Sequence, residues 1–182
     1  RSVATVAGLV ARPSGERWHD LPTALAGGGA LTVGVFAGLM VGDVLSVGPA
    51  VAVALSAALM FLTGLADDVI SLTPSAKLAF QGIGGALLVT LGVVYRVTGV
   101  AVLDSVLTLV WFIALSNAWN LLDNMDGAAA GVAVVASLGF SVLFVLEGAF
   151  AEAALAAAVA GAALGFLPGN ARAASIFMGD CG

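Results

Sequence analysis

The sequence predicts an all-α fold, a polytopic bundle of transmembrane helices, from three observations. Hydrophobic residues make up 61% of the 182 positions and charged residues only 9%, whereas a soluble domain carries about 25% charged residues. Long runs almost free of charge recur along the chain, each close to the ~20 residues that an α-helix needs to cross a bilayer. The acidic residues gather in the turns between these runs. These observations exclude a soluble globular protein.

Six complete spans are expected, at residues 25–42, 47–66, 78–95, 105–122, 128–146 and 150–167. Residues 2–11 are apolar but too short to cross a membrane, so a truncated first helix is expected there. Gly and Ala dominate the spans, which favours close packing between membrane helices. The single cysteine, Cys181, excludes an internal disulfide. We interpret residues 1–182 as one membrane domain, the N-terminal fragment of a longer protein.

Alternating the spans across the bilayer separates the loops into two groups. Loops 12–23, 67–77, 120–127 and 168–182 fall on one side, and this side holds four of the six basic residues. Because basic residues concentrate in cytoplasmic loops, this side is predicted to be cytoplasmic. The same side holds seven of the eleven acidic residues, which the charge rule does not explain. The chemistry is therefore expected at the cytoplasmic face.

The stretch 61–81, FLTGLADDVISLTPSAKLAFQ, ends an apolar run on two adjacent acids, Asp67 and Asp68. Lys77 then opens the next apolar run. Two neighbouring carboxylates in so apolar a chain are costly through desolvation and mutual repulsion. A divalent cation would offset that cost, because hard cations prefer carboxylate oxygens. Taken alone, the pair is equally well explained as a helix that ends in acids.

A second polar group, SNAWNLLDNMDG, closes the fourth span. Asn117, Asn120 and Asp123 recur every three residues, so a helix would stack them on one side. Helix capping, with a turn at Asp126 and Gly127, is the simpler explanation. Two amides and two acids exceed what a cap requires, and polar groups inside a membrane segment are functional candidates.

Two further segments share this face. GFLPGNARAASIFMGDCG contains Asn170, and its Asp180 follows a glycine where the chain is expected to bend. ERWHDLPTALAGGG contains His19, the only histidine, which in isolation would be a solvated loop residue. Together the four segments offer carboxylates for Mg²⁺, amides for oxygen-rich ligands and basic side chains for phosphates. The residues themselves thus indicate a membrane-embedded, Mg²⁺-dependent enzyme acting on a phosphate or diphosphate.

Four blocks in order, ERWHDLPTALAGG, GLADDVISLTPSAKLAFQ, NAWNLLDNMDGAAAG and GFLPGNARAASIFMGD, resemble a known family. They are similar to the polyprenyl-phosphate N-acetylhexosamine-1-phosphate transferases of glycosyl transferase family 4, relatives of phospho-N-acetylmuramoyl-pentapeptide transferase. The resemblance implies transfer of a sugar 1-phosphate from a UDP-sugar to a polyprenyl phosphate, with release of UMP. It also implies a multi-pass protein of a bacterial plasma membrane, compatible with a homodimer.

The resemblance further implies roles for individual residues. Asp67, Asp68 and Asp180 would surround Mg²⁺, or Mn²⁺ in its place, and the reacting phosphates, with one of Asp67 and Asp68 as the base. The metal ligands would be Asp180, Asn120 and Asp68. The substrate-binding residues would be Lys77, Asn117, Asn120, Asp123, Asp126, Asn170 and His19. The family continues beyond this chain with further spans and a basic loop that helps to bind the donor, so the fragment alone is not expected to carry the whole activity.

The sequence departs from the family pattern at several positions: Ala24–Leu25 replaces Pro-Arg, Asp123-Asn124-Met125-Asp126-Gly127 replaces DGxDG, and Ala173 replaces a proline. Three alternatives remain. An intramembrane prenyltransferase would carry further aspartates after Asp68, and residues 69–76 have none. A CDP-alcohol phosphotransferase would have an arginine where Gly131 stands. A cation transporter would place acids near span centres, whereas these acids lie at span ends.

Overall fold

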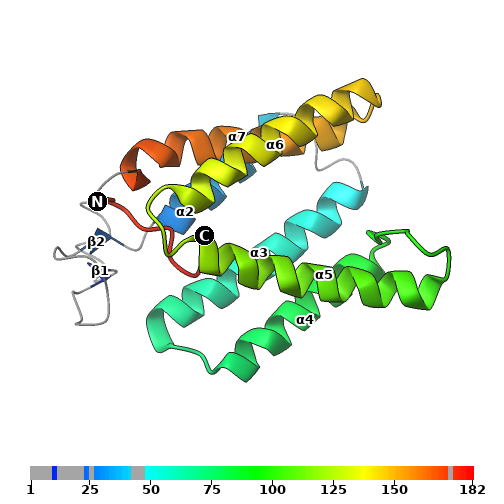
Figure 1. Ribbon diagram of the computed structural model, residues 1–182, viewed down its shortest axis with the longest axis horizontal. Helices are drawn as coiled ribbons and strands as arrows, with labels where there is room; N and C mark the ends of the chain where they lie inside the picture. Colours follow the sequence, from blue (N-terminus) through cyan, green and yellow to red (C-terminus); the bar gives the residue numbers. More distant parts are fainter. Residues whose placement is uncertain (1–9, 12–22, 25–26, 42–47, 172–173) are drawn as a thin grey trace.

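The computed structural model describes residues 10–11, 23–24, 27–41, 48–171 and 174–182 (Figure 1). A short antiparallel pair is formed by β1 (Val10–Ala11) and β2 (Thr23–Ala24). The described helices are α2 (Gly27–Val41), α3 (Gly48–Ile70), α4 (Pro74–Thr90), α5 (Ala101–Leu122), α6 (Ala128–Leu146) and α7 (Phe150–Asn170). Each falls on one of the apolar runs, so the all-helical class is confirmed.

The structure confirms four of the six predicted spans within the described residues. Within the described residues, four helices are long and apolar enough to cross a membrane: α3, α5, α6 and α7. The described part of α2 has 15 residues and α4 has 17, so six complete spans stay a prediction. The expected first helix is wrong for Val10 and Ala11, which lie in a strand, and its residues 2–9 lie outside the described part of the chain.

The helix ends on the acidic side also differ from the prediction. Helix α3 continues through Asp67 and Asp68 to Ile70, and α4 already begins at Pro74, so Lys77 lies in its first turn. Helix α7 continues through Pro168 to Asn170. The prediction ended each span where hydropathy falls. Backbone hydrogen bonding continues past that point, because charged and amide side chains do not by themselves interrupt a helix.

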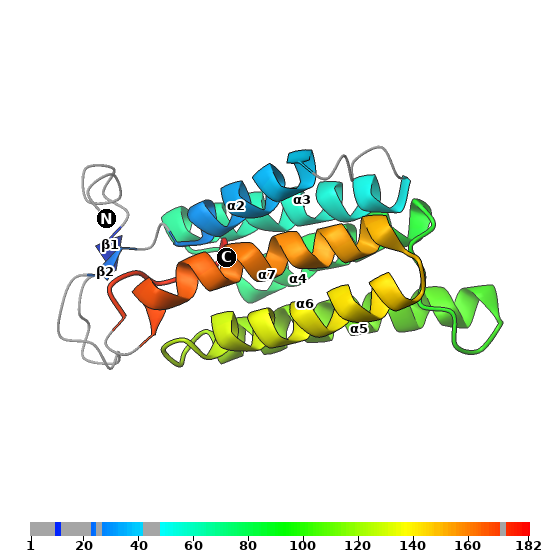
Figure 2. The same ribbon diagram turned by 90° about the horizontal axis from the view of Figure 1, so that it is seen from above.

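The helices form two groups (Figures 1 and 2). Helix α7 packs closely on α2 and α6, while α4 packs on α3 and α5; contacts between the two groups are few. Small residues bring α2 and α7 together, since a Cβ placed on Gly38 would lie 2.6 Å from the Ala158 Cβ. The close packing predicted from the small-residue content is thus seen where α2 meets α7.

The described loops gather at the two ends as the alternation predicts. The α3–α4 turn, the α5–α6 turn and the segment after α7 lie at one end, and residues 91–100 and 147–149 lie at the other (Figure 2). At the first end, Asp126 accepts a hydrogen bond from the N–H of Ala174, and Asn170 accepts one from the N–H of Gly127. This end therefore holds most of the candidate residues.

Candidate active site

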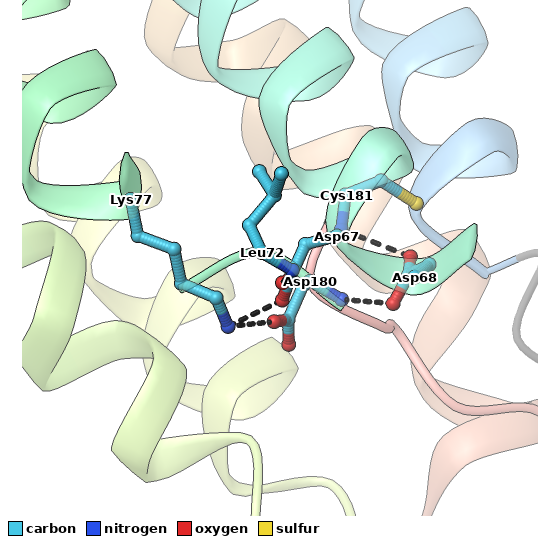
Figure 3. Close-up of polar contacts among 6 residues, drawn as sticks. All are labelled: Asp67, Asp68, Leu72, Lys77, Asp180 and Cys181. Atoms are coloured by element: carbon cyan, nitrogen blue, oxygen red, sulfur yellow. Dashed lines mark hydrogen bonds and ion pairs between the residues drawn. The ribbon is translucent and has the colours of Figure 1, made fainter. Parts of the chain in front are cut away.

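Lys77 joins two carboxylates from distant parts of the chain. Its Nζ forms an ion pair with Asp67, in the last turn of α3, and a second one at 2.9 Å with Asp180, in the segment after α7. Lys77 and Asp180 are 103 residues apart in the sequence. Figure 3 shows the three side chains converging. Folding therefore builds a compact charged cluster from three separate elements.

The turn between α3 and α4 determines where Lys77 stands. Ser71 adopts a left-handed φ of 53°, and the N–H of Leu72 donates to Asp67 Oδ1 at 2.7 Å. Thr73 then caps the first turn of α4 through its hydroxyl. A cation in the first turn of a helix is unfavourable in the field of the helix dipole. The paired carboxylates offset that cost and keep Lys77 beside the end of α3.

Asp68 points to the other side of α3 and holds the backbone of the C-terminal segment. Its Oδ1 accepts from the N–H of Asp180 at 3.0 Å, and its Oδ2 accepts from the N–H of Cys181 at 3.3 Å (Figure 3). Both carboxylate oxygens are thus engaged by backbone donors. The two adjacent acids have different surroundings: Asp67 faces the lysine, and Asp68 positions Asp180.

The C-terminal segment approaches the helices so closely that only glycine fits at two positions. A Cβ on Gly64 would lie 1.9 Å from the carbonyl oxygen of Asp180, and one on Gly28 would lie 2.4 Å from the backbone N of Gly182. Cys181 is buried here, and burial together with a neighbouring carboxylate raises the pKa of its thiol to about 12. The thiol is therefore protonated and unreactive at neutral pH.

Asn120 and Asp123, at the end of α5, face the same region. The pKa of Asp123 is raised to about 6, first by burial and then by repulsion from Asp180, Asp126 and Asp68. Burial, together with the neighbouring carboxylate of Asp67, also raises the pKa of Asp180, despite the opposing influence of its ion pair with Lys77. Crowded carboxylates of this kind favour a bound cation or a shared proton.

A cavity of about 660 Å³ lies beside these groups, between the two helix groups. Its polar end is lined by Asp67, Lys77, Asn120, Asp123 and Asp180. The rest of its wall is largely apolar and includes Val35, Phe36, Met60, Phe61, Trp111, Phe112 and Leu115. A ligand that is charged at one end and apolar along its length is complementary to such a cavity.

Two predicted substrate-binding residues support loops instead of lining this cavity. Asp126 Oδ2 accepts from the N–H of Ala174 at 3.1 Å. Asn170 is only 2% exposed; it accepts from the N–H of Gly127 at 3.0 Å and donates to the carbonyl of Ile176 at 3.1 Å. These bonds fasten the segment after α7 to the α5–α6 turn. Contacts of either residue with a substrate stay predictions.

Asn117 lies on α5 outside the cavity wall and donates from Nδ2 to Gln81 Oε1 at 2.9 Å. Gln81 itself lines the cavity, and the sequence analysis did not single it out. Its spacing was the available signal, because it follows Lys77 by one helical turn on the same face of α4. His19 lies outside the described residues.

A second buried acid, Asp104, lies at the opposite end of the molecule. It is 3% exposed, and its Oδ1 accepts from the N–H of Val97 at 3.2 Å and from both the N–H and the hydroxyl of Thr98 at 2.8 Å. Its carboxylate therefore holds the loop that leads into α5. Asp104 has a structural role, although its residue type alone would place it among the candidates.

The donor set fits Mg²⁺ only with help from a substrate. In the part of the chain that the structure describes, no three His, Cys, Asp or Glu side chains are close enough to hold a metal by themselves. Mg²⁺ is often held by one or two carboxylates together with substrate phosphates and water. Asp123, Asp180 and Asn120 line the cavity and suit that arrangement. The oxygens of Asp68, a predicted ligand, already accept two backbone hydrogen bonds.

Four helices long and apolar enough to cross a membrane, with carboxylates, an amide and a lysine gathered at one end, are consistent with a multi-pass membrane protein that has an acidic polar site. Residues 50–182 match the profile of glycosyl transferase family 4. The chain belongs to this family. The family assignment agrees with the resemblance of the four sequence blocks.

Three bacterial relatives illustrate the similarity. One, the decaprenyl-phosphate N-acetylglucosaminephosphotransferase of Mycolicibacterium smegmatis, is 36% identical over 100% of this chain and 52% of its own length. A probable undecaprenyl-phosphate N-acetylglucosaminyl 1-phosphate transferase of Bacillus subtilis is 29% identical over 100% of this chain and 53% of its own. A phospho-N-acetylmuramoyl-pentapeptide-transferase of a Synechococcus strain is 38% identical over 61% of this chain and 35% of its own. The chain spans about half the length of the first two relatives.

Proposed function

We propose that this chain is part of a polyprenyl-phosphate N-acetylglucosamine-1-phosphate transferase. The observation that carries the proposal is the cluster of Lys77 with Asp67 and Asp180 at the polar end of a largely apolar cavity. A lipid phosphate has the matching shape, with a charged head and a long apolar chain. The names of the M. smegmatis and B. subtilis relatives support this substrate class.

In the proposed reaction, an oxygen of the polyprenyl phosphate attacks the phosphorus that bears the sugar in a UDP-sugar. The new phosphorus–oxygen bond joins lipid and sugar phosphates, the bond between the two phosphates of the donor breaks, and UMP leaves with that electron pair. An ammonium has three donors. Within the described part of the chain Lys77 uses two of them, on Asp67 and Asp180, which leaves one N–H to bind a phosphate oxygen.

Asp67 is the better candidate for the base that keeps the attacking phosphate deprotonated. Asp67 lines the cavity beside Lys77, whereas Asp68 is not part of the cavity wall. Asp180, Asn120 and Asp123 are the proposed holders of Mg²⁺. When bound, the ion would neutralise the charge of the phosphates and align them. Asp68 then acts by placing Asp180 at the cavity.

The setting is proposed to be a bacterial plasma membrane, with this end of the molecule facing the cytoplasm, where UDP-sugars are made. Four helices of sufficient length and apolar character support a multi-pass arrangement. The remainder of the enzyme would complete the donor site, in which Asn117, Asp126, Asn170 and His19 stay candidates.

The test uses the full-length protein purified in detergent. It is supplied with UDP-N-acetylglucosamine, decaprenyl phosphate and Mg²⁺, and UMP release is followed for wild type, Asp180→Asn and Lys77→Met. Each variant is expected to lower turnover by about 100-fold or more. Glu147→Gln is the matched control, because Glu147 is an exposed acid at the opposite end of the molecule. It should retain wild-type turnover.

Two outcomes would count against the proposal. A well-folded wild type that releases no UMP from any UDP-sugar would overturn the reaction. UMP release at the wild-type rate in Asp180→Asn and Lys77→Met would support the proposed reaction but would show that it does not take place at this site.

A further inference from the structure

Gln81 is a buried amide whose carbonyl oxygen is hydrogen-bonded, while its NH₂ group has no partner among the described residues. Its side chain lines the cavity, and the residue is 9% exposed. Its Oε1 accepts from Asn117 Nδ2 at 2.9 Å. Among the described residues, Nε2 makes no hydrogen bond, although buried donors are nearly always bonded. The unused donor can therefore bond to a group outside the described residues.

The contacts of Asn117 fix which end of the Gln81 amide is unused. Asn117 Nδ2 also donates to the carbonyl of Ile113 at 2.8 Å. Because a backbone carbonyl only accepts, this atom of Asn117 must be the NH₂ nitrogen. An NH₂ nitrogen only donates, so the Gln81 atom that faces it must be the carbonyl oxygen. The NH₂ group of Gln81 is thus turned away from Asn117.

The position of Gln81 on α4 indicates what that NH₂ group would meet. Gln81 follows Lys77 by four residues, one helical turn of about 5.4 Å, on the same face of the helix. Both residues line the cavity, and so do the apolar side chains of Met60 and Phe112. A neutral donor therefore lies one turn beyond the ammonium, where the wall becomes apolar.

We propose that the Gln81 NH₂ group donates to a phosphate oxygen of the lipid substrate, and that Asn117 is a positioning residue which orients that amide. The phosphate of an amphiphile whose chain runs along the apolar wall would lie between Lys77 and Gln81. A hydrogen bond to an anion is stronger than one to a neutral acceptor, particularly where water is scarce. The inference rests on the proposed function and adds a second contact to the lipid phosphate.

The diphosphate of the UDP-sugar offers the same oxygen chemistry, so the experiment separates the two substrates. Binding of decaprenyl phosphate to the full-length protein is measured by native mass spectrometry without donor, and KM is measured for each substrate. Gln81→Glu keeps an oxygen for Asn117 and replaces the NH₂ group with an anionic oxygen. It should weaken lipid binding and raise the lipid KM by about tenfold or more, while the KM for the UDP-sugar stays unchanged.

The role of Asn117 is tested through Gln81. Asn117→Asp removes the donor that holds Oε1 and offers an acceptor, so the amide of Gln81 is expected to turn its NH₂ group out of the cavity. The lipid KM should rise as in Gln81→Glu. In a Gln81→Met background, Asn117→Asp should not raise the lipid KM further, because the amide that Asn117 orients is no longer present.

Controls keep folding separate from binding. Gly82→Ala changes the neighbouring position, where an added Cβ meets nothing within 4 Å, and should bind lipid as wild type does. Thermal unfolding shows whether each variant is folded. A folded Gln81→Glu protein with wild-type affinity for the lipid, or with a raised KM for the UDP-sugar alone, would overturn the inference. UMP release by the wild type would still support the proposed function in that case. Absence of UMP release from wild type would instead count against the function.

Discussion

The carboxylate of Asp68 holds the backbone of Asp180, 112 residues further along the chain, by accepting its N–H at 3.0 Å. Its second oxygen accepts the next N–H, that of Cys181. The adjacent acid, Asp67, pairs instead with Lys77. The two neighbouring aspartates therefore have different roles: Asp68 holds the backbone near Asp180, and Asp67 pairs with Lys77.

Asp68→Asn is expected to lower both stability and turnover. An amide offers one oxygen, so one of the two backbone donors loses its acceptor and faces an NH₂ group. The expected loss in the free energy of unfolding is about 1–3 kcal/mol, measured by thermal unfolding in detergent. Asp126→Asn is the matched control, because Asp126 accepts one backbone hydrogen bond and an amide oxygen can retain it. Equal losses in the free energy of unfolding for Asp68→Asn and Asp126→Asn would contradict the prediction.

Gly28→Ala and Gly29→Ala form a pair of neighbouring substitutions with opposite expectations. A Cβ at position 28 would lie 2.6 Å from the carbonyl carbon of Cys181, whereas one at position 29 meets nothing within 4 Å. Gly28→Ala should displace the segment that carries Asp180 and lower turnover by about tenfold or more. Gly29→Ala should be close to wild type. Turnover assays on both variants check this, and equal activity would rule out the close approach.

The stability of the protein should depend on pH through Asp123. Its pKa is raised from 3.8 to about 6, so the folded state binds more protons than the unfolded state between these values. The contribution of Asp123 to stability is therefore greatest at low pH and falls as pH rises from about 4 to 6. Thermal unfolding across this range should show a decline that Asp123→Asn reduces. Parallel curves for the two proteins would contradict the raised pKa.

Added Mg²⁺ should change that profile in a defined direction. A cation near Asp123 favours the ionised carboxylate. Mg²⁺ should therefore stabilise the folded protein more above pH 6 than below it. The same titration of Asp123→Asn should show a weaker dependence on pH. Stabilisation by Mg²⁺ that is independent of pH in both proteins would place the ion elsewhere.

Asp104→Asn tests whether a buried acid outside the site is purely structural. Its Oδ1 accepts three hydrogen bonds from residues 97 and 98, and the charge of the carboxylate strengthens each of them. The substitution should lower the midpoint of thermal unfolding. Turnover per folded molecule should stay at the wild-type value. A selective loss of turnover would show that this end of the molecule takes part in the reaction.

The sequence predicted the helices well because hydropathy reports burial in an apolar medium. It misplaced the ends of α3 and α7, since hydropathy falls at Asp67 and near Pro168 while the helices continue to Ile70 and Asn170. The end of α3 depends on local geometry, with Ser71 at a positive φ. Hydropathy carries no such information.

The sequence placed Asp67, Lys77 and Asp180 on one face, and the structure brings their side chains together; the roles of these residues stay predictions. The gathering of Asp67, Lys77 and Asp180 follows from alternating the spans across a bilayer. That Asp68 holds two backbone N–H groups, or that Asn170 fastens two loops, depends on contacts between segments more than 40 residues apart. Such contacts follow from packing, which one sequence does not reveal.

The ion pair between Asp67 and Lys77 also bears on how the protein is made. Both residues belong to one helical hairpin, α3 with α4, so the acid and its cation leave the ribosome within a few residues of each other. Asp67 is therefore paired as soon as the hairpin forms, which reduces the cost of burying its charge at the end of α3. Asp180 is synthesised 103 residues after Lys77. The excess negative charge of the site is therefore completed last, beside helices that are already in place.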